Sequence, residues 1–576
     1  AALSDKGIPK KAVHIRNLVL GCEFLMSSMT HFYHLAAPSY VQGPNMAPWT
    51  PYFNDAFYSP LLRSAGKGTA SGTLPGETLT FSTDLWSAVI KQYVKALRIR
   101  RLTFEAGALF AGRMPMTSCF VAGGVTFPAS EDLNVAGGKC DKFKSMLDEI
   151  GTFVVREYVP LVLALGALYG DFDNAGNSGF NPDGMVTARP GKGYGAGVGN
   201  FLAWGGFPIV SDTVGVQALT FPRGFKLGAA LKQDITVADV GTQMRESVYS
   251  SYYASVVGGI AETGFTGTSS EPLKVVRTVP DREATTGYSW LKSPRWNDNA
   301  MEVGPLARLA VAGLYPVNQT AIAAGGLSVY YLLYTKTVNS ITGLDPKMIE
   351  PDLAVALLRS GLATLTNGGT VYGIGTGETA LPLTADEIAA AYYHADTVIT
   401  GIVAGWVIGL KGGLSTMDRL RARALESLFL MINMIGAPSK AATGIVWDGT
   451  GWIQGLKALG TAATFIAKDY PVGGSTGTFG ATEAPRGALL HTCSINAAGK
   501  ISAYQCVVPT TWNASPKSTS NVLSRGPIEQ AMMGIPYANQ TVLMPTQAGG
   551  TQTAEGGVEA LRVAQSFDPC IACAVH

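Results

Sequence analysis

The amino-acid sequence predicts an α+β fold dominated by helices: a large multi-helix body with small β elements at its periphery. The chain has 576 residues, of which 47% are hydrophobic, and can therefore bury a large core. Apolar residues recur at three- and four-residue spacing in several long segments, the periodicity of helices that pack against a core. Glycine-, serine- and threonine-rich stretches separate these segments, and no stretch has the composition of a flexible linker. We therefore expect residues 1–576 to form one domain.

The segment 84–101 illustrates the helical pattern. Its apolar residues, among them Val89, Tyr93 and Leu97, form one stripe along a helix. Further helices are expected at 12–36, 141–168, 300–314, 386–411 and 416–436. Long surface loops or short hairpins are expected at 64–80, 170–200, 366–384, 473–480 and 547–557.

Charge and hydropathy exclude several classes of function. The formal net charge is +2, so no strong field favours nucleic acid, and none is expected as a partner. The longest apolar runs, Tyr158–Tyr169 and Ile399–Leu410, are shorter than the roughly 20 residues of a membrane helix and are interpreted as buried helices. Residues 1–20 have no signal-peptide pattern, so attachment to a membrane or export would depend on another chain.

Several motif-like stretches carry little information. GYGAGVGN (193–200) and GIGTG (373–377) lack the strand, helix and acidic residue that a dinucleotide site needs, and are interpreted as loops. Arg98, Arg100 and Arg101 are placed at a helix end, where they would complement the helix dipole. His31 and His34 lie one turn apart among aromatic residues and are interpreted as core polar groups.

The seven cysteines are scattered, which argues against a disulfide framework. They are Cys22, Cys119, Cys140, Cys493, Cys506, Cys570 and Cys573. Only the last two are close in sequence. A lone CxxC fits a redox pair, half of a zinc site or a disulfide, and two such thiolates can also converge on another metal.

The sequence around this pair is more specific. It reads SFDPCIACAVH, with Asp568 and Pro569 before the cysteines and His576 after them. DPCxxCxxH resembles the C-terminal signature of nickel–iron hydrogenase large subunits, which a maturation protease cuts after this histidine, so His576 is expected to end the processed form. Other blocks resemble the same family in the same order, closest to its respiratory uptake members: Ile15–Leu35, Tyr158–Tyr169, Gly287–Leu306, Arg419–Glu426, Glu483–Leu489 and Tyr504–Pro516. The resemblance implies the nickel–iron hydrogenase large-subunit fold.

The resemblance also implies a metal centre. Cys570 matches a terminal nickel thiolate, and Cys573 matches a thiolate that bridges nickel to an iron carrying CO and cyanide. Arg486 matches the arginine over the open metal site, and Asp568 the acidic residue that orients it. Sulfur donors suit both metals.

Further matches concern the surroundings of that centre. Pro485, Val508, Pro509 and Thr510 match the pocket for the diatomic ligands, with the Thr510 hydroxyl as a hydrogen-bond donor to cyanide. His576 and the backbone carbonyl of Cys506 match a magnesium site, and magnesium favours such hard ligands.

The implied reaction is heterolytic oxidation of H2 to protons and electrons. Either the Cys570 thiolate or Arg486 would take the proton. The electrons would pass to a small subunit, because the remaining cysteines are too isolated to bind iron–sulfur clusters. A membrane cytochrome or another acceptor would follow. The expected location is the extracytoplasmic face of the cytoplasmic membrane, reached on the small subunit.

The family pattern is incomplete here. Its first cysteine pair and two glutamates lie upstream of the segment that Ala1–Leu3 continues. We expect a separate polypeptide to carry that segment, which would make this a split large subunit. Ser39 also stands where the family has an aspartate near the arginine. The alternatives are a metal-free structural relative, such as the quinone-site subunit of respiratory complex I, and a hydrogen sensor.

Overall fold

The structure is a computed structural model of the chain. The structure describes residues 8–40, 83–168, 195–210, 218–228, 230–257, 260–262, 265–266, 277–315, 335–337, 340–344, 349–350, 353, 364–367, 370–372, 397–400, 414–441, 444–466, 475–533, 541–545, 551–555 and 558–574.

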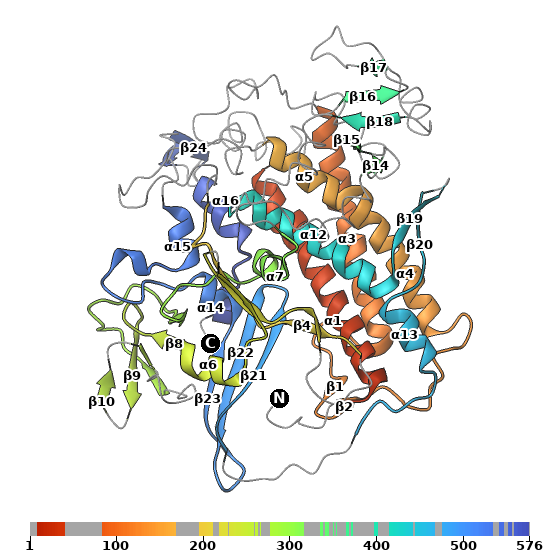
Figure 1. The fold of residues 1–576 in the computed structure, drawn as a ribbon. Helices are drawn as coiled ribbons and strands as arrows, with labels where there is room; N and C mark the ends of the chain where they lie inside the picture. The colour runs from red at the N-terminus through yellow and green to blue at the C-terminus, as the bar shows by residue number, and fades with distance from the viewer. Residues whose placement is uncertain are drawn as a thin grey trace.

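A bundle of long helices forms one side of the molecule (Figure 1). Helix α1 packs against α3 and α12, α3 packs against α4, and α12 also contacts α5, α7, α13 and α16. Their apolar side chains form the largest core cluster. Two π-helical segments, η1 and η3, and the 3-10 segment η2 continue the helices that precede them. The bounds are α1 Lys10–Thr30, η1 His31–Ala36, η2 Ala37–Ser39, α3 Thr83–Ala111, α4 Lys139–Phe153, η3 Val154–Tyr158, α5 Val159–Leu168, α7 Pro305–Val311, α12 Thr416–Ile435 and α13 Trp452–Ala458.

Helix α12 lies at the centre of this bundle, and local sequence fixes both of its ends. The Ser415 hydroxyl accepts a hydrogen bond from the Asp418 N–H, and the Asp418 carboxylate accepts one from the Ser415 N–H. This reciprocal capping box satisfies two backbone donors at the helix start. The helix ends at Gly436, whose φ of +93° is a conformation that favours glycine.

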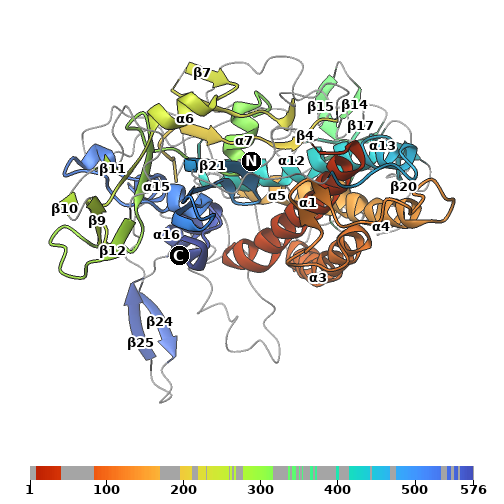
Figure 2. The ribbon, with the colours of Figure 1, turned by 90° about the horizontal axis from the view of Figure 1, so that it is seen from below.

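The strands form small antiparallel sheets (Figures 1 and 2). Several of these sheets lie on the other side of the molecule from the bundle, whereas β1–β2, β19–β20 and the sheet that contains β15 and β18 lie beside the bundle. In the sheet β21–β22–β23, the strand β22 contacts both α7 of the bundle and α14 near the C-terminal segment. A second core lies among the strands and contains three fully buried tryptophans, Trp204, Trp296 and Trp512. The strands are β1 Phe120–Val121, β2 Gly124–Val125, β3 Asn200–Ala203, β4 Gly206–Pro208, β5 Leu219–Phe221, β6 Gly224–Leu227, β7 Ala230–Gln233, β8 Met244–Ser247, β9 Tyr253–Val257, β10 Ile260–Glu262, β11 Phe265–Thr266, β12 Arg277–Pro280, β13 Ser293–Trp296, β14 Thr335–Thr337, β15 Ser340–Leu344, β16 Thr364–Asn367, β17 Thr370–Tyr372, β18 Thr397–Thr400, β19 Pro438–Ala441, β20 Gly444–Trp447, β21 Ser475–Ala484, β22 Gly487–Ile495, β23 Ile501–Val507, β24 Thr541–Pro545 and β25 Thr551–Glu555.

Short helices carry the connections near the sheets. They are α6 Val237–Gln243, α14 Pro509–Asn513, η6 Val522–Ser524, α15 Pro527–Met532, α16 Val558–Ser566 and α17 Ile571–Ala574. In the part of the chain that the structure describes, none of the helices combines the length and apolar composition that a membrane crossing needs.

The long helices predicted from periodicity are confirmed, although some bounds differ. The predicted helix 12–36 is α1 with η1, 141–168 is the run from α4 to α5, and 416–436 is α12. The predicted helix 300–314 is shorter, because α7 covers only Pro305–Val311. The mixed helix and strand content confirms an α+β fold but not the expected dominance of helices.

One predicted helix is wrong where it can be checked. Residues Thr397–Thr400 of the predicted helix 386–411 form strand β18, which pairs with β15 and β16. The segment TVIT is rich in β-branched side chains, which favour strands once neighbouring strands are available. The other residues of 386–411 lie outside the described residues. The segments 366–384, 473–480 and 547–557 contribute strands to antiparallel hairpins where they are described.

The placement of Arg98, Arg100 and Arg101 at a helix end is also wrong. Helix α3 continues to Ala111, so the three arginines lie in its interior. Arg98 pairs with Glu149 of α4, and Arg101 pairs with Glu105 one turn later. These arginines therefore do not complement a helix dipole.

Candidate functional site

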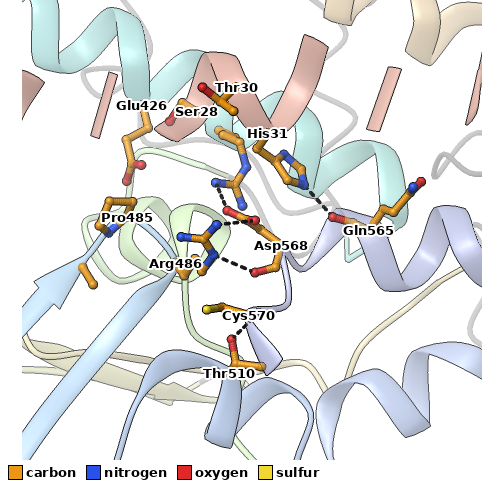
Figure 3. A network of polar contacts seen from close by, with 12 residues as sticks. Ser28, Thr30, His31, Glu426, Pro485, Arg486, Thr510, Gln565, Asp568 and Cys570 are labelled. Carbon is orange, nitrogen blue, oxygen red and sulfur yellow. Dashed lines mark hydrogen bonds and ion pairs between the residues drawn. The ribbon is translucent and has the colours of Figure 1, made fainter. Parts of the chain in front are cut away.

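The CxxC motif lies at the junction of the bundle and the sheet β21–β22–β23 (Figure 3). Helix α16 ends at Ser566, and Asp568 follows with a φ of +54°, which is uncommon for a residue other than glycine. The chain then reaches Cys570 and the single-turn helix α17. The Cys570 N–H donates to the Thr510 hydroxyl of α14 at 3.1 Å, so two of the predicted site residues are in direct contact.

Arg486 reaches this motif from the turn between β21 and β22. Its Nε donates to the Asp568 backbone carbonyl at 3.1 Å, and its Nη2 lies 3.2 Å from Asp568 Oδ1. The Arg486 side chain is 33% exposed, whereas that of Asp568 is 2% exposed. Asp568 therefore holds the guanidinium, which stays partly exposed to solvent next to the segment that carries Cys570. The predicted pairing of Arg486 with Asp568 is present in the structure.

The turn that carries Arg486 is itself held by Arg308 of α7. Arg308 is fully buried and donates to the backbone carbonyls of Ala484 and Pro485, both at 2.9 Å. It also pairs with Glu426 at 2.5 Å and Glu483 at 2.7 Å. Burial raises the pKa of Glu483 to about 7, although Arg308 acts in the opposite direction. These contacts fix the position of Pro485.

Asp568 has a second guanidinium partner on its buried side. Arg423 of α12 places Nη1 3.2 Å from Asp568 Oδ2, and both side chains are 2% exposed. Burial alone would raise the pKa of Asp568. The charges around it, first that of His31 when protonated at low pH and then those of Arg423 and Arg486, outweigh burial and hold that pKa below its ordinary value. Asp568 is therefore an anion at neutral pH.

His31 lies beside this cluster at the end of α1. Its Nε2 is 2.6 Å from the Gln565 carbonyl oxygen, which can only accept, so Nε2 carries the proton. Burial, and then the nearby Arg423, lower the pKa of His31 to about 4. His31 is thus a neutral, buried polar group at neutral pH, in agreement with its interpretation from the sequence.

Helix α16 is anchored to the same end of α1. The Ser39 hydroxyl donates to Gln565 Oε1 at 2.8 Å, and Gln565 Nε2 donates to the Leu35 carbonyl at 3.0 Å. Arg562 Nε donates to the Ser39 carbonyl at 2.9 Å. Ser39 therefore holds α16 in place, and it lies where the resemblance to the family implies an aspartate.

Cys570 and Cys573 form a disulfide in the structure, with their Cα atoms 5.3 Å apart. This is one of the alternatives that the sequence left open for a CxxC pair. Reduction by two electrons would release two adjacent thiols, a donor set that fits nickel or iron. Cys573 and the neighbouring Ile571, which is 59% exposed, face outward. The assignment of both cysteines as metal ligands stays a prediction.

The other cysteines do not complete a metal site around this pair. Among the described residues, His, Cys, Asp or Glu side chains nowhere form a set of three that could hold a metal ion. Cys22 is buried in α1 against Gly107 of α3, nine residues before His31, or about 13 Å along a helix. Cys119 interacts with Arg16, still farther along α1.

The remaining predicted residues surround the motif. Val508 packs with Leu291 and Ala574, and Pro509 begins α14. Cys506 lies in β23 opposite His491, and its Sγ is 3.3 Å from His491 Nδ1. His576 lies outside the described residues, so the magnesium site formed by His576 and the Cys506 carbonyl stays a prediction.

Sequence reasoning missed Arg423, Arg308 and the site-adjacent position of His31. Arg423 lies within the family-like block Arg419–Glu426. Arg308 lies just after the family-like block Gly287–Leu306. The signal available was the alternation of arginine with small or apolar residues, RLRARALE, within an otherwise apolar helix. A charged residue on a buried helix needs a partner, which the sequence does not identify.

Comparisons with known proteins identify the family of the chain. A family model described as nickel-dependent hydrogenase matches residues 75–340 and 387–576. The periplasmic [NiFeSe] hydrogenase large subunit of Desulfomicrobium baculatum is 27% identical and aligns with 97% of this chain and 77% of its own length. The uptake hydrogenase large subunit of Rhizobium leguminosarum bv. viciae is 25% identical over 99% of this chain and 81% of its own.

Solved structures give the same result for the fold. The reduced, active form of the Ni-Fe-Se hydrogenase from Desulfomicrobium baculatum has a TM-score of 0.60 at 24% identity, covering 100% of this chain and 85% of that one. The [NiFeSe] hydrogenase G50T variant from Desulfovibrio vulgaris Hildenborough has a TM-score of 0.61 at 24% identity, with coverages of 99% and 82%. The family model covers well over half of the residues, and the chain therefore belongs to the nickel-dependent hydrogenase family, among its large subunits.

Proposed function

We propose that this chain is the catalytic subunit of a hydrogenase that oxidises H2 heterolytically at a nickel–iron centre. The observation that carries the proposal is the position of Arg486, whose guanidinium is locked onto Asp568 beside Cys570 and is open on one side. A partly exposed arginine that is fixed by Asp568 two residues before Cys570 supports a catalytic role more than a purely structural one.

Each residue of the proposed site has a separate role. Cys570 and Cys573, once reduced, would hold the centre through sulfur. When bound, the centre supplies the metal chemistry that polarises H2. Arg486 pairs with the Asp568 carboxylate, and a guanidinium offers N–H donors but no acceptor atom for a proton. The Cys570 sulfur is therefore the proposed proton acceptor, and Arg486 would provide positive charge over the reacting position.

The surroundings support the same centre. The Thr510 hydroxyl accepts from the Cys570 N–H, which leaves its own hydrogen free to donate to a cyanide ligand of the iron. Pro485, Val508 and Pro509 would line the pocket for CO and cyanide. His576 and the Cys506 carbonyl would hold magnesium.

A full centre needs two more thiolates, and the five other cysteines do not surround Cys570 and Cys573. The two further thiolates are proposed to approach over the outward-facing side of α17. An iron–sulfur small subunit would accept the electrons and pass them to a membrane cytochrome or another acceptor. The periplasmic location of the Desulfomicrobium relative supports an extracytoplasmic, membrane-associated location reached on that subunit.

The test is the nickel and iron content of the native complex, together with its H2–D2 exchange activity and the identity of its polypeptides. Cys570→Ala should remove nickel and exchange activity, because it deletes one of the metal's sulfur ligands. Cys493→Ala is the matched control, since Cys493 is a partly buried cysteine in β22, outside the motif. Normal nickel content in Cys570→Ala would contradict the ligand assignment.

One observation favours the metal-free relative as a second candidate. A scaffold that binds no metal could keep Cys570 and Cys573 as a permanent disulfide, because it would not need their thiolates as ligands. The same measurement separates the two candidates: a native complex with the disulfide intact and without nickel supports the scaffold.

A further inference from the structure

Arg423 lies on the interior side of Asp568, opposite Arg486. The two carboxylate oxygens are divided between the two arginines: Oδ2 faces Arg423 and Oδ1 faces Arg486, each at 3.2 Å. The side chains differ in exposure, since that of Arg423 is 2% exposed and that of Arg486 is 33% exposed. One arginine thus belongs to the core, and the other reaches solvent.

The backbone of Asp568 adds a reason for this arrangement. Its φ of +54° is costly for a residue with a side chain, and it persists only where surrounding contacts enforce it. Arg486 holds both the carbonyl and the carboxylate of this residue, while Arg423 holds the other carboxylate oxygen. Cys570 follows two residues later, so the same contacts set the start of the CxxC segment.

We propose that Arg423 is a positioning residue of the active site, which keeps Asp568 turned so that one carboxylate oxygen alone is presented to Arg486. This inference rests on the proposed function. Without Arg423 the buried carboxylate would have Arg486 as its remaining guanidinium partner. Both carboxylate oxygens would then pair with the Arg486 guanidinium. This bidentate pair would draw Arg486 inward, away from solvent.

The first test uses Arg423→Gln and Arg423→Lys in the native complex. Each should retain nickel, because neither removes a sulfur ligand. Each should lower the turnover number for H2 by about 100-fold, the order of loss for a small misplacement of a catalytic group. The KM for H2 should change little. Lysine should not rescue, since its single ammonium cannot reproduce the forked guanidinium.

Arg421→Lys is the matched control. Arg421 lies two residues earlier on α12, is also buried, and pairs with Asp418 at 3.1 Å rather than with Asp568. The complex with Arg421→Lys should keep its turnover number. Equal losses in the Arg421 and Arg423 variants would mean that Arg423 has only a structural role, and would overturn the proposal.

A double-mutant cycle tests whether Arg423 acts through Asp568. In the Asp568→Asn background, Arg423→Gln should have no further effect on turnover, because the carboxylate that it positions is gone. Additive losses would contradict the proposal.

A last measurement does not depend on the metal. In the intact chain, phenylglyoxal modifies exposed arginines, and the modified peptide that contains Arg486 can be followed by mass spectrometry. Arg423→Gln should slow this modification severalfold, because Arg486 is drawn inward, and Arg421→Lys should not. An unchanged rate would overturn the proposal even if the unsubstituted complex held no nickel. Absence of nickel together with slowed modification would instead refute the proposed function and leave the positioning role of Arg423 supported.

Discussion

Two arginine clusters that look alike in the sequence have opposite environments in the structure. RIRR (98–101) lies on α3 and RLRAR (419–423) on α12. On α3 the side chains of Arg98 and Arg101 are 59% and 71% exposed, and their partners are glutamates on the same or the adjacent helix. On α12 the side chains of Arg419, Arg421 and Arg423 are at most 6% exposed.

The partners explain the difference. Arg419 pairs with Glu302 and Arg423 with Asp568, residues more than a hundred positions away in the chain. A buried guanidinium is tolerated only when a carboxylate and hydrogen bonds compensate for lost hydration. Helix α12 is central and α3 is peripheral (Figures 1 and 2). The arginines on α12 therefore connect distant segments, whereas those on α3 are exposed to solvent. Buried ion pairs on α12 thus hold together segments that are distant in the chain, whereas exposed pairs on α3 add little to stability.

The largest effect is expected for Arg419→Gln. Arg419 makes a two-pronged pair with Glu302, at 2.7 and 2.9 Å, and also donates to the Gly195 carbonyl. Removing it would leave a carboxylate in the core without its guanidinium, at a cost of about 3–5 kcal/mol of unfolding free energy. Urea denaturation of the complex measures this loss. Glu302→Gln in the same chain should restore part of the stability, and a loss under about 1 kcal/mol would contradict the comparison.

An intermediate effect is expected for Ser415→Ala at the buried start of α12. The substitution removes the cap on the Asp418 N–H and should destabilise the protein by about 1–2 kcal/mol. Thr236→Ala removes the corresponding cap of α6, where the contacts are exposed, and should cost about 0.5 kcal/mol. Thermal unfolding of the two variants side by side checks the order, and a reversed order would show that burial does not set the strength of a cap.

The smallest effect is expected for Arg98→Gln. The Arg98–Glu149 pair joins α3 to α4 at 2.5 Å, but both side chains are exposed, so solvent screens the attraction. The loss should be at most about 0.5 kcal/mol and should disappear at about 1 M salt. A loss as large as that of Arg419→Gln, unchanged by salt, would break the distinction between the two clusters.

Much of the architecture could be predicted from sequence. The spacing of apolar residues located the long helices, among them the helix expected at 416–436, which is α12. Periodicity failed at Thr397–Thr400, because a short apolar run fits a buried helix and a strand equally well, and the neighbouring strands β15 and β16 decide between them. Periodicity also predicted that the helix begun at 84 ends at 101, but α3 continues to Ala111.

The sequence by itself determined the family, because the block order and the DPCIACAVH ending are visible without coordinates. It also determined the chemistry of the candidate residues, since a thiol or a guanidinium carries its properties wherever it lies. Tertiary structure alone decided which residues meet. Arg486, Arg423 and Asp568 are separated by up to 145 positions in the chain, and their contact exists because α12, the β21–β22 turn and the end of α16 pack at one point. Ion pairs of this kind depend on distance and burial, which only packing fixes.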